Sequence, residues 1–237
     1  RIDMTESSAG SKPAKSELTK KRIMETYLAI VPCKKWDKIT VKEICAGAHI
    51  TRGTFYQYYS DIYDLMEQIE NALIDDLTEK YHAIVKHPKT FYPPERFEEK
   101  FDYSPPRFLN VWFEFCRNNR KAMAVLLDPQ NGDTYFVKKL KGILKDYINT
   151  MMDDDGMPRY GLREYFVKIF MELHFLAART WLTSEDDEFL SVHEIINLLN
   201  TMRVGANYLT YRRLTSEDFD MKMEVPKESA PPKGERP

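Results

Sequence analysis

Apolar residues recur along the chain with the spacing of amphipathic helices, and this pattern predicts an all-α protein. From about residue 16 onward, apolar side chains repeatedly fall at i, i+3, i+4 and i+7, which places them on one face of a helix. No alternating apolar and polar run of useful length indicates a strand. The predicted helices span residues 16–31, 41–48, 52–59, 61–86, 108–118, 120–127, 135–152, 159–182 and 192–213.

Breaks in this pattern divide the chain into four parts. Residues 1–15 are small and polar and predict a flexible arm, and residues 214–237, with four prolines, predict a disordered tail. Between them, we expect a helix-turn-helix domain over residues 16–60 and a helical body over residues 61–213. Within the body, residues 87–107 are rich in proline and aromatic side chains, which predicts a loop packed on the body as a lid.

The helix-turn-helix prediction rests on two short helices separated by a tight turn. Residues 40–43 (TVKE) have the pattern of a capping box, in which a threonine and a glutamate satisfy each other's backbone N–H groups. Thr51 offers a second N-cap, directly before the helix predicted over residues 52–59. In a helix-turn-helix the second helix enters the major groove of DNA.

The second of these helices has side chains that suit contact with DNA. Arg52 can reach a guanine edge or a phosphate, and Thr54 and Gln57 are short polar groups that can contact bases. Tyr56 and Tyr58 can donate their hydroxyl hydrogens to phosphate oxygens. The alternative interpretation is that a short helix rich in aromatic residues is simply part of the core.

The distribution of charge favours the DNA-binding interpretation. The chain has a net charge of −2, but residues 12–60 contain 10 Lys/Arg against 4 Asp/Glu, while the rest contains 25 against 33. A basic module on an acidic body is expected if only the first part meets phosphates.

Residues 20–66 resemble the N-terminal DNA-binding domain of the tetracycline-repressor (TetR) family of bacterial regulators. The resemblance is carried, in order, by an amphipathic first helix, Trp36, Ile39-Thr40-Val41, Ile44, Ala48, Ile50-Thr51-Arg52-Gly53-Thr54-Phe55-Tyr56 and Tyr59. It implies that several of the polar residues above stand where the family contacts DNA. The candidate DNA-binding residues are Thr40, Lys42, Thr51, Arg52, Thr54, Tyr56, Gln57 and Tyr58.

The chain departs from the family pattern at three places. His49 replaces the glycine of the turn, where the backbone is expected to be left-handed or nearly so. The glycine that usually follows the first helix is replaced within residues 33–35. Ile62 replaces a lysine that contacts phosphate in the family, which puts one anchoring contact in doubt.

The body also resembles the ligand-binding and dimerisation domain of the same family, in residues 132–136 and in the aromatic helix that ends at Leu182. The resemblance implies a homodimer through the last two long helices, which suits a palindromic double-stranded DNA operator. It also implies a pocket for a small apolar or aromatic effector among the aromatic residues of the body, although such stripes are often plain core. The candidate pocket residues are Phe108, Trp112, Phe115, Cys116, Met123, Phe136, Phe170, His174 and Trp181.

No constellation for catalysis or metal binding is evident. His82 and His87 lack an acidic partner at a zinc-binding spacing. Residues 153–156 (DDDG) begin like a calcium-binding EF-hand loop, but the later ligand positions do not fit, so an acidic turn that ends a helix is expected. There is no GxSxG, phosphate-binding glycine loop or HExxH motif. We therefore expect no enzyme, no cofactor and no metal.

Three cysteines far apart from one another indicate a reducing compartment, and no apolar run has the roughly 20 residues of a membrane span. The expected protein is soluble, cytoplasmic and bacterial. The leading hypothesis is a dimeric, ligand-responsive transcriptional regulator, most simply a repressor. The alternative is a TetR-like coactivator that acts by binding another protein.

Overall fold

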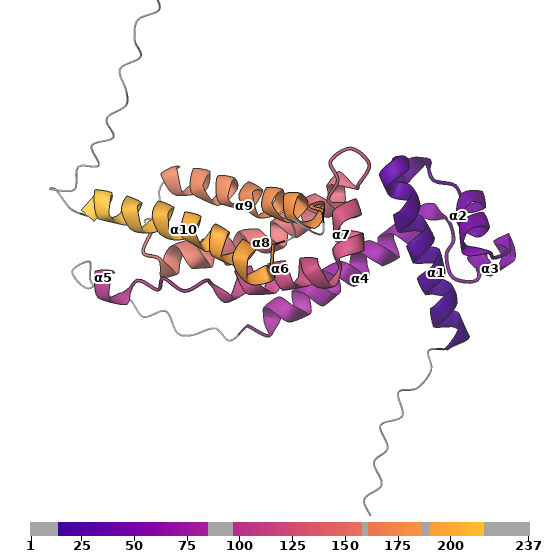
Figure 1. The fold of residues 1–237 in the computed structure, drawn as a ribbon, viewed down its shortest axis with the longest axis horizontal. Helices are drawn as coiled ribbons and strands as arrows, with labels where there is room; N and C mark the ends of the chain where they lie inside the picture. The colour runs from indigo at the N-terminus through magenta and orange to yellow at the C-terminus, as the bar shows by residue number, and fades with distance from the viewer. Residues whose placement is uncertain (1–13, 85–96, 158–160, 186–189, 216–237) are drawn as a thin grey trace, which may run out of the picture.

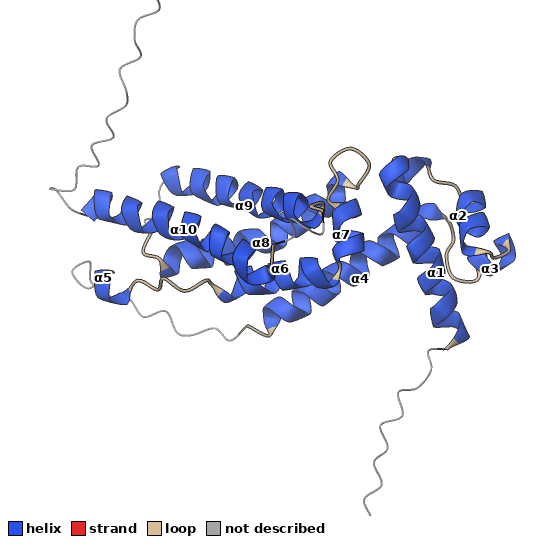
Figure 2. Ribbon diagram, viewed as in Figure 1, coloured by secondary structure: helices blue, strands red, loops and turns tan. Residues whose placement is uncertain are grey.

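The structure is a computed structural model that describes residues 14–84, 97–157, 161–185 and 190–215. Every regular element in these ranges is a helix, so the predicted all-α class is confirmed (Figure 2). The chain forms a small N-terminal head at one end and a larger helical body, and α4 (Ile62–His82) runs from one to the other (Figure 1). The predicted tail lies outside the described residues except for its first two positions, and the predicted arm except for its last two.

The head consists of α1 (Lys15–Ile30), α2 (Val41–Ala48) and α3 (Arg52–Tyr56), with two short 3₁₀ turns, η1 (Val31–Cys33) and η2 (Trp36–Lys38), between α1 and α2. Proline at the second position of η1 lacks a backbone N–H group, which suits a new helical turn but not the interior of α1. The head has a core of buried side chains that includes Ile23, Tyr27, Ile44, Phe55 and Tyr59.

Trp36, by contrast, is only half-buried, and its ring packs edge-on against Tyr63 at 5.4 Å between centroids. The last helix of the head is also shorter than predicted. It ends at Tyr56 rather than residue 59, because the backbone tightens where Tyr58 N–H bonds the Phe55 carbonyl at 3.0 Å. Tyr59 nevertheless stays in the core.

The body contains α6 (Arg107–Asn118), α7 (Arg120–Leu126), α8 (Thr134–Asp154), α9 (Gly161–Leu182) and α10 (Val192–Thr215), with the single-turn helix α5 (Phe97–Lys100) before them. The helix α5 was not predicted, and α10 continues two residues past its predicted end. Asp133 caps α8, because its side chain accepts the Tyr135 N–H at 2.9 Å.

The acidic turn at residues 153–156 ends α8, and buried arginines neutralise two of its carboxylates. Arg163 pairs with Asp153 and Arg203 with Asp155, each at 2.8 Å. Arg203 also donates to the backbone carbonyl of Ser104 at 3.1 Å, so it fastens the described part of the predicted lid to α10. The turn therefore joins three segments of the body.

Candidate nucleic-acid interface

Side-chain hydrogen bonds fix the start of α2. The Thr40 hydroxyl accepts the Glu43 N–H at 3.3 Å, and the Glu43 carboxylate accepts the Thr40 N–H at 2.9 Å, which completes the predicted capping box. Lys34 Nζ lies 2.8 Å from the same carboxylate. Hydrogen bonds from Lys34 and Thr40 lower the pKa of Glu43 to about 2, so this group is charged at neutral pH. Lys34 is thereby engaged in positioning α2 rather than free to bind phosphate.

The turn between α2 and α3 has the left-handed residue that the sequence predicts. His49 has φ 53° and ψ 51°, and the following Ile50 N–H bonds the Cys45 carbonyl at 3.0 Å. This closes α2 and redirects the chain. Close to this point α2 packs tightly on α1, since a Cβ added at Gly47 would lie 2.5 Å from Thr26 Cγ2.

The second helix of the pair presents polar side chains outward from a fixed start. The Thr51 hydroxyl accepts the Thr54 N–H at 3.1 Å, as predicted for an N-cap. Phe55 is fully buried and anchors the inner face of α3. Arg52 and Gln57 are exposed, so they extend from the opposite side.

The structure brings all eight candidate DNA-binding residues to the head, and they differ in exposure. Thr54 and Tyr58 are half-buried, and Lys20 Nζ lies 5.8 Å from the centre of the Tyr58 ring. The other six are exposed: Thr40, Lys42, Thr51, Arg52, Tyr56 and Gln57.

The start of α4 lacks the cation that the family pattern would supply. Ile62 is buried against the core, so it cannot stand in for the lysine. Asp61 caps α4 by accepting the Asp64 N–H at 2.8 Å, and Asp64 in turn accepts the Ser60 N–H at 2.7 Å. Two carboxylates at this position disfavour an approaching phosphate.

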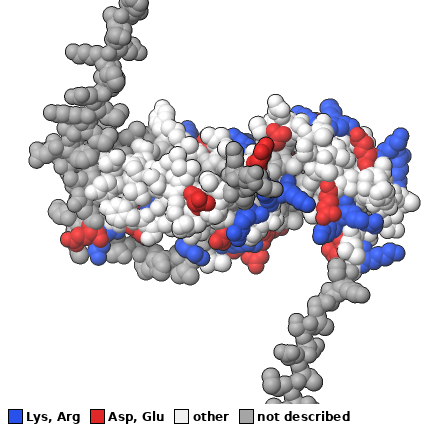
Figure 3. Space-filling model, in the orientation of Figure 1, with Lys and Arg blue, Asp and Glu red and all other residues white. Residues whose placement is uncertain are grey.

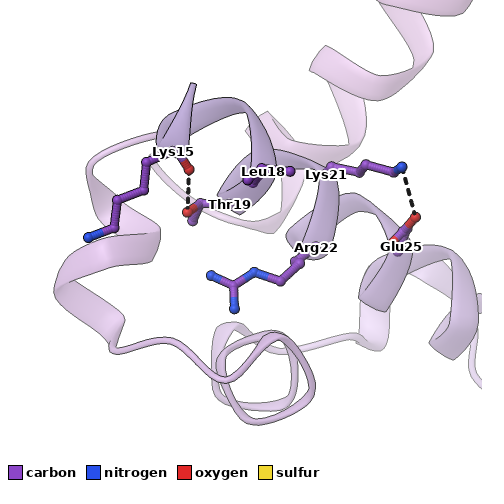
Figure 4. A pocket seen from close by; sticks show the side chains of 6 residues that line it. All are labelled: Lys15, Leu18, Thr19, Lys21, Arg22 and Glu25. Atoms are coloured by element: carbon purple, nitrogen blue, oxygen red, sulfur yellow. Dashed lines mark hydrogen bonds and ion pairs between the residues drawn. The ribbon is translucent and has the colours of Figure 1, made fainter. Parts of the chain in front are cut away.

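Cationic side chains on α1 add to the charge of the head. Lys15 and Arg22 extend to the same side of a shallow hollow of about 460 Å³, while Lys21 turns away and pairs with Glu25 at 3.9 Å (Figure 4). Sequence reasoning assigned these residues no role. The i, i+7 spacing of Lys15 and Arg22, which places both on one helix face, is the signal that was available. Lys and Arg also surround the head on the face seen in Figure 3.

All nine candidate effector residues are buried, and all except His174 belong to one hydrophobic cluster that extends from the head through the body. The His174 ring stacks on Phe108, with 5.7 Å between centroids, and meets the edge of Phe170 at 4.7 Å. His174 Nδ1 lies 2.6 Å from the Phe170 carbonyl, so Nδ1 carries the hydrogen and Nε2 is an acceptor. Burial lowers the pKa of His174 to about 4, so the ring is neutral.

Three polar atoms in this core have no hydrogen-bond partner among the described residues. They are His174 Nε2, the Trp112 indole nitrogen and the Tyr81 hydroxyl. Tyr81 stacks on Tyr147 at 4.4 Å, and Tyr147 stacks in turn on Phe108, so these aromatic side chains are contiguous. Buried groups without partners are rare in folded proteins and call for an explanation.

A second hollow, of about 500 Å³, lies on the surface between α7 and α9, where Arg179 lines it. Within the described ranges, no three His, Cys, Asp or Glu side chains are grouped so that they could hold a metal ion. None of the described helices combines the length and the apolar character needed to cross a membrane.

Solved structures of TetR-family regulators have the same fold. One is a TetR-family transcriptional regulator from Streptomyces coelicolor, with a TM-score of 0.51 and 17% identity over 84% of this chain and 83% of that one. Another is a TetR transcriptional regulator from Streptococcus agalactiae 2603V, with a TM-score of 0.51 and 18% identity over 79% of this chain and 94% of that one. No family model and no curated protein sequence matches the chain. At such identities the likeness concerns the fold.

Proposed function

We propose that this protein is a dimeric transcriptional regulator that binds a palindromic DNA operator through α3 and is switched by a small effector in the body. The observation that carries the proposal is the capped α2–α3 unit. Its second helix is anchored by buried Phe55 and presents Arg52, Tyr56 and Gln57 to solvent. That is the arrangement by which a recognition helix contacts base edges while its flanks contact phosphates.

The surface of the body supports a dimer through α9 and α10. Exposed apolar side chains lie four and then seven residues apart on each helix, which places them on one face. They are Tyr165, Ile169 and Leu176 on α9, and Leu198, Met202 and Leu209 on α10. In Figure 3 the side of the body over α9 and α10 is almost free of charged groups. A two-fold dimer would pair these faces and place two heads on two half-sites.

The unpartnered atoms of the body core support an effector site and limit its chemistry. The Trp112 N–H and the Tyr81 O–H can donate, and neutral His174 Nε2 can accept. The core would therefore suit a small aromatic molecule that carries a hydroxyl or carbonyl oxygen. Because the ring of His174 is uncharged, a neutral molecule suits it better than a carboxylate. The effector would act by binding more tightly to the conformation that holds the heads in one position than to the conformation that holds them in another.

The test is a binding titration between the purified chain and labelled DNA that flanks its own gene, with unrelated DNA of equal length as control. We expect specific retardation at low salt that weakens steeply as salt increases, because phosphate contacts release counterions. Equal affinity for both DNAs, measured on a demonstrated dimer, would refute operator binding.

The coactivator alternative rests on the acidic start of α4, where Ile62 is buried and two aspartates replace a cation. It predicts no specific DNA affinity together with tight, salt-resistant association with another regulatory protein. The same titration therefore separates the two functions.

A further inference from the structure

Three buried oxygen-bearing side chains meet where the head joins the body. Tyr27 comes from α1, Glu70 from α4, and Asp133 is the residue that caps α8. Tyr27 is fully buried, and Glu70 and Asp133 are 2% and 7% exposed. The cluster thus contains one side chain from the head, one from the connecting helix and one from the body.

Hydrogen bonds fasten this part of the body to the head. The segment 128–133, which ends at the capping aspartate, lies against the residues that follow α1. Trp36 N–H donates to the Asn131 carbonyl at 3.2 Å, and Asn131 Nδ2 donates to the Pro32 carbonyl at 3.1 Å. Asp133 therefore lies two residues from a backbone segment that is hydrogen-bonded to the head.

The two carboxyl groups of the cluster require a proton between them. A hydrogen bond between the side chains of Glu70 and Asp133 is one of the causes that raise the pKa of Glu70. Two carboxylates offer acceptors alone, so this bond forms only if one of them is protonated. Asp133 already accepts the Tyr135 N–H, whereas Glu70 Oε1 has no hydrogen-bond partner among the described residues, so we assign the proton to Glu70. Among the described residues, neither carboxyl group has a Lys or Arg ion pair, and Glu70 Oε1 and the Tyr27 hydroxyl have no hydrogen-bond partner.

The surrounding groups agree with a protonated Glu70. Burial, followed by the charge of Asp133, raises the pKa of Glu70 to about 8. Glu67 also raises this pKa, whereas Lys139 lowers it. Burial and the two carboxyl groups also raise the pKa of Tyr27, so its phenol stays neutral. At neutral pH the pair therefore carries one proton and one negative charge.

We propose that Glu70 and Asp133 share one proton at the junction of head and body, and that loss of this proton loosens the head from the body. Ionised Glu70 would face the charged Asp133 across a buried interface with no cation in contact, which is unfavourable. In a regulator, this makes the placement of the heads, and hence operator affinity, sensitive to mildly alkaline pH. That regulatory consequence rests on the proposed function, whereas the shared proton does not.

The sign of the pH dependence follows from the pKa of Glu70, which is higher in the folded chain than its ordinary value of 4.5. The folded state therefore binds more protons than the unfolded state between pH 4.5 and about 8. The stability contributed by this group is fully present below pH 4.5, declines as the pH rises to about 8, and changes no further above that.

The test is urea unfolding of the full chain at several pH values, with Glu70→Gln as the main variant. Glutamine has the shape of the protonated acid and can donate to Asp133 at every pH. We expect the unfolding constant of the wild type, relative to Glu70→Gln, to rise by up to about tenfold per pH unit between about pH 5 and 8. The matched control is Glu79→Gln, an exposed glutamate further along α4 that has no part in the raised pKa of Glu70, and it should parallel the wild type. Parallel curves for the wild type and Glu70→Gln would overturn the proposal.

Two further measurements do not depend on the folding of Glu70→Gln. The infrared spectrum of the wild type at neutral pH should contain the carbonyl band of a buried protonated carboxylic acid, and its absence would also overturn the proposal. Asp133→Asn keeps an N-cap for α8 but removes the charge, so this band should disappear at a lower pH than in the wild type. Looser docking should appear as faster hydrogen exchange of the Trp36 amide above pH 8, compared with Glu70→Gln at the same pH.

None of these measurements uses DNA, so the two proposals can fail separately. A pH-sensitive junction in a chain without operator affinity would refute the proposed function alone. Specific operator binding by a chain whose junction shows no shared proton would refute this inference alone.

Discussion

Arg52 is the side chain that we expect to contribute most to operator affinity. It occupies the first position of α3, is exposed, and forms no ion pair with the described residues. Arg52→Ala should weaken specific binding by about 1–3 kcal/mol if the guanidinium contacts a guanine. If it contacts phosphate instead, the variant should bind every DNA sequence more weakly by a similar factor. The slope of log affinity against log salt concentration should then decrease by about one.

Fluorescence anisotropy titrations of labelled operator at several salt concentrations distinguish these two outcomes. The matched control is Arg117→Ala, which removes an exposed arginine of α6 in the body. Equal losses for the two variants would mean that α3 is not the contact surface.

His49 is a second residue whose backbone predicts a measurable effect. Its left-handed conformation is unfavourable for a side chain with a Cβ atom, whereas glycine adopts it freely. His49→Gly should therefore stabilise the chain by up to about 1 kcal/mol, reduced by the extra freedom of glycine in the unfolded state. Urea unfolding measures the change.

Gly47→Ala, two residues earlier, is the control for His49→Gly, because it should change the stability of the chain in the opposite direction. The new methyl group would lie 2.5 Å from Thr26 Cγ2, so this variant should be destabilised. A loss of stability in His49→Gly would show instead that the imidazole makes a stabilising contact.

The loop between α7 and α8 is the element whose geometry tolerates least change. A Cβ added at Gly132 would lie 2.5 Å from the Leu126 carbonyl oxygen and 2.6 Å from that of Asp128. Both atoms belong to the backbone and cannot rotate away. Gly132→Ala should therefore destabilise the chain by about 1–3 kcal/mol, as overpacking does.

Gly142→Ala, within α8, is the matched control, because its Cβ would meet nothing within 4 Å. Alanine is the better helix former, so this variant should gain about 0.5–1 kcal/mol. Thermal unfolding of both variants tests the contrast. If Gly142→Ala lost as much stability as Gly132→Ala, the destabilisation could not be attributed to crowding in the loop.

The starts of the helices were predictable because helix caps are local in sequence. Thr40 and Thr51 cap as predicted, and Asp61 and Asp133 cap α4 and α8 in the same way, each through a backbone N–H two or three residues ahead. The left-handed turn at His49 was equally local, since only a few residues determine it.

Long-range pairings of polar groups were not predictable. Arg203 and Asp155 are 48 positions apart, and helical periodicity alone gives no reason for either to be buried. Glu70 is a similar case, because a glutamate in an amphipathic helix is ordinarily expected on the solvent-exposed face. Its burial depends on where α1 and the cap of α8 meet α4.

The arrangement of the effector candidates shows the same limit. The aromatic residues were correctly placed in the body core, because apolar periodicity predicts burial. Whether they enclose space or fill it depends on how five helices pack. In the structure these residues are buried together, and the feature that distinguishes this part of the core is the set of unpartnered atoms on His174, Trp112 and Tyr81.

The molecule as a whole has one strongly cationic end and one weakly charged side, and the two features predict different losses of function. The head carries the cations that face DNA in the proposed function, and the side over α9 and α10 is almost free of charged groups (Figure 3) and exposes apolar side chains. Loss of charge on the head should reduce DNA affinity without changing the association state. Loss of the apolar side should change the association state first.

Leu198→Glu tests the second of these expectations. Leu198 is 46% exposed on α10, within the apolar face of that helix, so a carboxylate there would be buried without a partner in the proposed dimer. We expect a folded monomer by sedimentation velocity. Its operator affinity should be much weaker than that of the wild type, because the two heads no longer bind as one unit.

The control is Leu18→Glu, which makes the same change at a leucine of α1 that is 48% exposed. This variant should remain dimeric, although its added negative charge near Lys15 and Arg22 should weaken DNA binding. The two variants would then lose affinity for different reasons, one through association and the other through charge. A dimeric Leu198→Glu would place the contact between subunits elsewhere on the body.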